Sequence, residues 1–157
     1  MAAISADLKE VLTAMELTVL PEDFVLVHLP ENIKAIPGEW FRRATTRFAV
    51  VVQEPKTVTM ILPRRKWLRM QNIFDKYESN GPWKVLGFKT KRPPVTIGLL
   101  AAVEAALRGA KIQIIPVSTL RRFHVLVPKS DLPRAVRALR DLMEHCGKKK
   151  AGPGPRA

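Results

Sequence analysis

Apolar residues along the first half of the chain change their spacing several times, and each spacing is typical of one kind of element. Leu8, Val11 and Leu12 recur at helical intervals, whereas the β-branched residues that follow alternate as in strands. The segment 33–40 is ambiguous, and one interpretation is a short helix broken at Pro37-Gly38. The other predicted elements are a helix over 5–14, strands over 17–20 and 24–29, a hairpin over 47–62 and an amphipathic helix over 64–77.

A second cycle of elements follows Gly81-Pro82, which we interpret as an internal boundary because this pair neither extends a helix nor suits a central strand. Pro93 and Pro94 delay the next helix to about residue 95, and Gly109 ends it. Ser130-Asp131 caps the last helix. The elements predicted here are a strand over 83–88, a helix over 95–107, strands over 111–118 and 123–127, and a helix over 130–145.

The element order β-α-β-β-α therefore occurs twice, over about 17–79 and 83–145, without residue-level identity between the copies. This order predicts an α+β protein of two tandem ferredoxin-like modules, each an antiparallel sheet with its helices packed on one face. The predicted domains are an N-terminal helical extension over 1–15, a first module over 16–80, a second module over 81–146 and a disordered basic tail over 147–157.

The composition is that of a soluble globular protein, because 46% of the 157 residues are hydrophobic and 26% are charged. No apolar stretch reaches the roughly 20 residues that a membrane span needs, and the N-terminus lacks the pattern of a secretory signal. Cys146 is the only cysteine, so no internal disulfide forms, which favours a reducing, cytoplasmic location. Only three Asn and three Gln occur, a balance reminiscent of thermophile proteins.

Sequence patterns of known catalytic and metal sites do not occur in this chain. It contains neither a GxSxG nucleophile elbow nor a phosphate-binding GxxxxGK[ST] loop. The histidines His28, His124 and His145 lie far apart, without HExxH or CxxC patterns. We therefore predict that the protein is not an enzyme, and that it has no catalytic residues, no cofactor and no metal site.

Positive charge is concentrated after residue 62. The formal net charge is +13, yet residues 1–62 contain six basic and eight acidic side chains, whereas the remainder contains 21 basic and six acidic ones. This asymmetry has two interpretations. In one, the basic residues form a surface for an anionic partner such as RNA, DNA or an acidic protein. In the other, they form a solvated surface that serves stability and solubility.

Three motifs in the second half resemble the tandem ACT-domain family, and in particular its branch of small two-module proteins related to the cytosolic arginine sensors. The motifs are Val95-Thr96-Ile97-Gly98-Leu99-Leu100-Ala101, Ile115-Pro116-Val117-Ser118-Thr119 and His124-Val125-Leu126-Val127-Pro128. The similarity spans about 16–143. It implies a regulatory protein, without catalysis, that binds an amino acid or another small effector at an interface between modules or subunits. A homo-oligomer is expected because sheet edges and apolar helix faces are open.

The resemblance also implies where the effector binds. Unpaired N–H groups at a helix start attract an anion such as a carboxylate, which favours the same place on physical grounds. Arginine near this place favours an anion over the ammonium group of an amino acid. The implied ligand-binding residues are Thr96, Ile97, Gly98, Val117, Ser118, Thr119 and Arg121.

The alternative function is a nucleic-acid-associated protein that uses the ferredoxin-like sheet as a scaffold. Its best candidate segment begins at Arg64, where cations would neutralise phosphates and an indole face would stack on an unpaired base. The same segment is also read as a helix start with Trp67 packed inward and the cations in water. The candidate residues are Arg64, Arg65, Lys66, Trp67, Arg69, Lys91 and Arg92.

Overall fold

The structure, a computed structural model of the 157-residue chain, describes residues 4–30, 47–90, 98–120 and 122–148. It divides the chain into two compact units. The inserted unit is Leu20–Lys84, and the split unit combines Met1–Val19 with Val85–Ala157. The predicted segment 33–40, the loop prolines Pro93 and Pro94, and most of the predicted tail lie outside the described residues.

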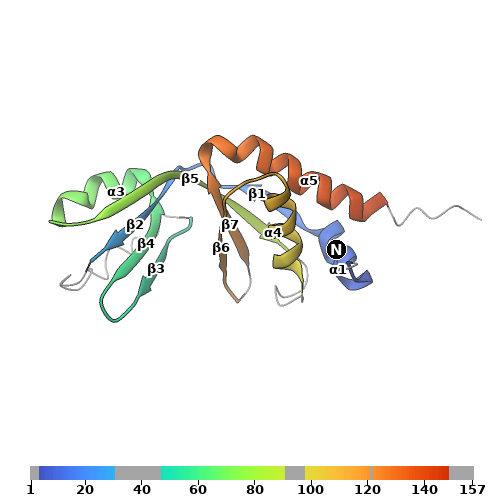
Figure 1. The fold of residues 1–157 in the computed structure, drawn as a ribbon, viewed down its shortest axis with the longest axis horizontal. Helices are drawn as coiled ribbons and strands as arrows, with labels where there is room; N and C mark the ends of the chain where they lie inside the picture. Colours follow the sequence, from blue (N-terminus) through green and yellow to red (C-terminus); the bar gives the residue numbers. More distant parts are fainter. Residues whose placement is uncertain (1–3, 31–46, 91–97, 121, 149–157) are drawn as a thin grey trace, which may run out of the picture. The chain divides into compact units, whose positions relative to one another are not determined.

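The inserted unit contains β2 (Phe24–Leu29), β3 (Val50–Gln53), β4 (Val58–Pro63), α3 (Arg64–Met70), the short 3-10 helix η1 (Gln71–Ile73) and the first part of β5 (Glu78–Lys89) (Figure 1). β2 pairs antiparallel with both β4 and β5, and β3 pairs antiparallel with β4. The strand order is therefore β5-β2-β4-β3. Counted along the unit, the strands lie in the order fourth, first, third, second.

The split unit contains α1 (Ala6–Ala14), β1 (Glu16–Val19), the second part of β5, α4 (Leu99–Gly109), β6 (Ile115–Ser118), β7 (Phe123–Pro128), the 3-10 helix η2 (Lys129–Asp131) and α5 (Leu132–Lys148). β1 pairs with β5, β5 neighbours β7, and β7 pairs with β6. The order β1-β5-β7-β6 repeats that of the inserted unit if β1 counts as the fourth strand. The split unit thus takes its last strand from the N-terminal end of the chain, which makes it a circular permutation of the other unit.

One hydrophobic core holds the split unit together. Side chains from α1, α4 and α5, among them Leu12, Val103 and Leu139, are fully buried against Leu86 of β5 and Val125 of β7. Figure 1 shows α4 and α5 beside β6 and β7, with α1 next to α5. The Ser5 hydroxyl starts α1 by accepting a hydrogen bond of 3.2 Å from the Leu8 N–H, as a helix cap does. The N-terminal helix is therefore part of this unit and not an extension.

The core of the inserted unit lies between α3 and its sheet. Trp67 and Met70, three residues apart on α3, pack with Val27 and Leu29 of β2 and Met60 of β4. The predicted helix over 64–77 ends earlier, at Met70, and continues as one turn of 3-10 helix. The chain then enters β5, so Glu78 and the residues after it are in a strand.

Gly81-Pro82, predicted as an internal boundary that does not suit a central strand, lies inside β5. The pairing register between β2 and β5 shifts between Phe24 and Leu26, opposite this pair. An irregularity of this kind accepts a proline, since no ladder hydrogen bond from its nitrogen is needed there. A Cβ on Gly81 would lie 3.0 Å from the Phe24 carbonyl oxygen, so the close strand approach needs glycine. The boundary between the two units falls three residues later, between Lys84 and Val85.

Two other boundaries also differ from the prediction, for local reasons. The strand predicted over 111–118 begins only at Ile115, because the Lys111 and Ile112 N–H groups donate to Arg108 and Leu107 carbonyls and so complete the end of α4. The last helix continues through Gly147 to Lys148, two residues into the predicted tail. The predicted α+β class with ferredoxin-like antiparallel sheets is confirmed.

Candidate functional site

The start of α4 is shaped by Gly98. Its φ of 87° lies in the left-handed region, which glycine adopts without strain. The first intrahelical hydrogen bond runs from the Ala102 N–H to the Gly98 carbonyl over 2.9 Å. The N–H groups of Leu99, Leu100 and Ala101 precede that bond, so they belong to the set that an α-helix does not satisfy by itself. The positive end of the α4 dipole is at this place.

The predicted hydroxyls at the end of β6 have different roles. Ser118 is exposed and pairs with Phe123 across the hairpin. The Thr119 hydroxyl donates to the Arg122 carbonyl (3.0 Å) and accepts from the Arg122 N–H (3.1 Å). The structure therefore uses the Thr119 hydroxyl to close the β6-β7 turn, a common local role of threonine.

The structure describes only some of the predicted residues of this site. Val117 is half-buried and precedes Ser118 on β6, whereas Thr96, Ile97 and Arg121 lie outside the described residues. The β6-β7 turn and the first turn of α4 lie toward the same end of the split unit (Figure 1). This end therefore combines the helix start with the exposed Ser118.

A row of residues on the sheet of the split unit was not predicted as a site. Thr18 of β1 pairs with Gly87 of β5, and its hydroxyl donates to the Gly87 carbonyl over 3.2 Å. A Cβ on Gly87 would lie 2.9 Å from that hydroxyl and 3.6 Å from the His124 ring. Burial, and then the charge of Arg122, lower the pKa of His124 below 6.5. The pairing of β1 with β5 and the neighbouring position of β7 bring these residues together, which no spacing in the sequence indicates.

The basic segment at α3 is arranged as a solvated helix start. Trp67 is only 2% exposed, stacks on Phe74 with a centroid distance of 5.7 Å, and meets Tyr77 edge-on at 4.9 Å. A buried indole is unavailable for stacking on a base, so the inward interpretation of Trp67 is confirmed and its proposed role in nucleic-acid binding is wrong. Arg64, Arg65 and Arg69 are exposed on this helix. Lys91 and Arg92 lie outside the described residues.

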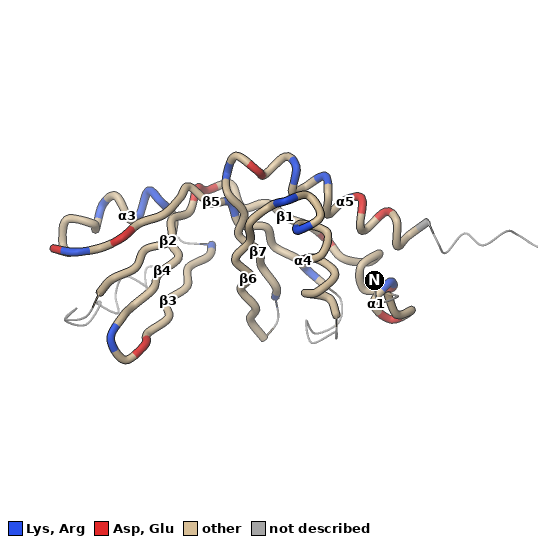
Figure 2. Tube along the Cα trace, viewed as in Figure 1, with Lys and Arg blue, Asp and Glu red and all other residues tan. Residues whose placement is uncertain are grey.

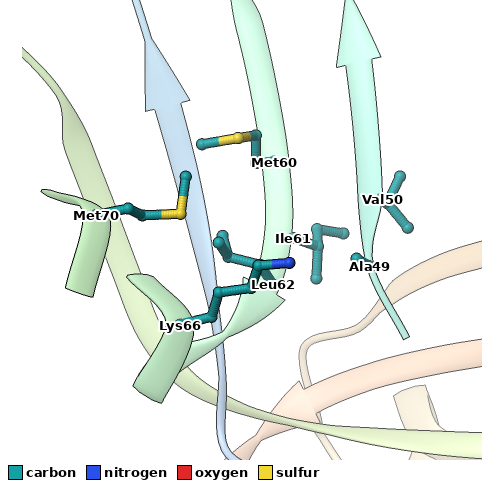
Figure 3. Close-up of a pocket in the computed structure, with 7 residues that line it drawn as sticks. All are labelled: Ala49, Val50, Met60, Ile61, Leu62, Lys66 and Met70. Atoms are coloured by element: carbon teal, nitrogen blue, oxygen red, sulfur yellow. The ribbon is translucent and has the colours of Figure 1, made fainter. Parts of the chain in front are cut away.

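A small hollow lies between α3 and the strands β3 and β4. Figure 3 shows Met60 and Met70 reaching toward one another, with the Lys66 ammonium group beside Ile61 and Leu62. The lining is otherwise apolar, with no acid-base pair. Among the described residues, no group of three or more His, Cys, Asp or Glu side chains is arranged to hold a metal ion. No helix in the described part of the chain is long and apolar enough to cross a membrane.

Part of the chain matches a known protein family. Residues 78–141, from β5 into α5, match the family model described as the ACT domain. This part of the chain is therefore similar to the ACT domain. No curated protein matches the chain.

Several solved structures share the fold at low identity. A Vibrio cholerae protein of unknown function, described as a possible transport protein, is 18% identical with a TM-score of 0.67, and the match covers 88% of this chain and 99% of that one. A protein from Agrobacterium tumefaciens is 21% identical, with a TM-score of 0.63 and coverages of 82% and 89%. The regulatory subunit of aspartate kinase from Thermus thermophilus is 10% identical, with a TM-score of 0.60 and coverages of 82% and 98%. These likenesses show an ACT-like fold.

Proposed function

We propose that this protein is a regulatory, non-enzymatic ACT protein that binds a small anionic metabolite, an organic acid or an amino acid through its carboxylate. The supporting observation is that α4, within the ACT-domain match, starts at a left-handed glycine with its first-turn N–H groups ahead of the intrahelical ladder. Such a start attracts a carboxylate through both the N–H groups and the helix dipole. Arg122 lies in the β6-β7 turn, and a cation there disfavours an ammonium group.

The effector acts in this proposal by stabilising one arrangement of the protein over another, for which its affinity for the two must differ. We propose a homo-oligomer in the cytoplasm, with the effector at a subunit interface. β3 and β6 are the end strands of the sheet order, and the exposed Val51 and Val52 of β3 would be covered by a second copy.

The test is a pair of substitutions at one position. Gly98→Asn and Gly98→Asp have nearly the same shape, and both residue types tolerate the left-handed conformation better than other residues do. The aspartate places a negative charge beside the first-turn N–H groups, so it competes with an anionic ligand. Isothermal titration against a panel of organic acids and amino acids should give affinities for Gly98→Asn within about threefold of wild type, and losses of about tenfold or more for Gly98→Asp.

Native mass spectrometry of the purified protein would identify a co-purified metabolite with which to start the panel. The proposal fails if no compound of the panel binds, or if the Asn and Asp variants bind alike.

A further inference from the structure

The solvent-facing side of α3 carries an unusual set of residues. Because Trp67 and Met70 point into the core of the inserted unit, helical geometry places Arg65, Leu68 and Arg69 on the opposite side, with Arg64 at the edge of that side, one turn before Trp67. All four are exposed, and Leu68 keeps 47% of its surface in water. We name this set the α3 arginine face. The helix contains no Asp or Glu, as the colouring of Figure 2 shows.

Local electrostatics act against this helix. Its N-cap is Pro63, which makes no side-chain capping bond, and its first turn holds cations at the positive end of the helix dipole. Arg65 and Arg69 repel one another at a separation of four residues. Among the residues that the structure describes, no carboxylate forms an ion pair with Arg64, Arg65 or Arg69. Burial of Trp67 and Met70 holds α3 in place, and such a conflict between local and global preference is expected where a surface has a function.

The apolar part of the surface shows which kind of anion fits. Leu68 lies among the arginines, and the residues directly after the helix expose Ile73 to 63% and Tyr77 to 40%. Phosphates alone would make no use of the exposed Leu68 and Ile73, and the buried Trp67 indole cannot stack on a base. A surface of arginines around an exposed leucine complements a protein segment that carries both carboxylates and apolar side chains.

We propose that the α3 arginine face docks an acidic amphipathic segment of a partner protein. Carboxylates of the segment pair with Arg64, Arg65 and Arg69, whose guanidinium groups suit two-point contacts, and an apolar side chain covers Leu68. The face belongs to the inserted unit, whereas the effector site proposed above belongs to the split unit. Failure of one proposal would therefore leave the other unaffected.

The experiment uses the full chain and a fluorescent helical peptide of about 15 residues with leucines along one side and glutamates flanking them. Binding is followed by fluorescence anisotropy. We expect Arg65→Glu/Arg69→Glu to weaken binding by about tenfold or more, and Leu68→Ser by about threefold or more. The matched control is Arg137→Glu/Arg140→Glu, which changes the net charge equally at exposed positions of α5 and should leave the affinity within about twofold.

Three further probes decide the chemistry of the partner. A peptide with serine in place of leucine should bind more weakly, and so should a single-stranded oligonucleotide of equal charge. A peptide with lysine in place of two glutamates should regain affinity for Arg65→Glu/Arg69→Glu. Absence of binding, equal losses in the two double variants, or an oligonucleotide that binds more tightly than the peptide would each overturn the proposal.

Discussion

The N-terminal segment should be indispensable to the split unit, because it supplies both α1 and the outer strand β1. Leu8, Val11, Leu12 and Met15 are all buried in the shared core of that unit. Each such side chain contributes about 1.5–3 kcal/mol on burial, or about 6–12 kcal/mol for the four. This is comparable to the whole stability of an ordinary domain, about 5–15 kcal/mol. Removal of residues 1–19 should therefore unfold the unit.

The assay compares the fragment 20–157 with a permuted chain that carries residues 1–19 after residue 157. Far-ultraviolet circular dichroism reports mainly on the split unit, which contains α4 and α5, whereas Trp67 and Trp83 report on the inserted unit by fluorescence. The fragment should lose most of its helical signal and its cooperative urea transition, and the permuted chain should regain both. A fragment that keeps the helical signal and midpoint of the full chain would refute the nested arrangement.

Three smaller predictions test single side chains. Arg65→Glu should stabilise the protein by about 0.5–1.5 kcal/mol, since it improves both the dipole interaction and the pairing with Arg69, and thermal unfolding that shifts downward would contradict this. Lys84→Met should cost about 1.5–3 kcal/mol in urea unfolding, because the ammonium group is bonded to the Pro21 carbonyl at 2.8 Å and to Asp23 at 3.0 Å; an unchanged midpoint would show that these bonds contribute nothing. The lowered pKa of His124 means that the folded state holds this proton less tightly than the unfolded chain, so its contribution to stability is present above pH 6.5 and is lost as pH falls through the lowered pKa. Wild type should thus lose more unfolding free energy on acidification than His124→Gln, and parallel pH profiles would exclude His124 as the source.

Strongly patterned segments could be predicted from the sequence. The strand over 24–29 agrees with β2 residue for residue, because Phe24 and the β-branched Val25 and Val27 lie between Pro21 and Pro30. The helix before Gly109 was also predicted, although its start is Leu99 and not residue 95. Both patterns are local, so they can be read without knowledge of the pairing partners.

The nested topology could not be predicted in the same way. A strand over 16–19 suits the first position of one module or the last position of another, and only its pairing with β5 distinguishes the two. That pairing joins residues about 70 positions apart, such as Thr18 and Gly87, and leaves no periodicity in the sequence. At the candidate site, the sequence indicates both Gly98 and Thr119, but local bonds to Arg122 use the Thr119 hydroxyl.

The positive net charge of the chain divides into cations that serve the fold and cations that remain available. Lys84 is buried to 12% exposure and bound to the turn before β2, and Arg134 donates to both Asp131 and the Ala110 carbonyl. Such cations add to the net charge without adding a surface that a partner could use. The arginines of α3 have no such described carboxylate, and they lie within two turns of one helix. Recognition of an anionic partner depends on this local density, since separated surface charges are screened within about 10 Å in ordinary salt.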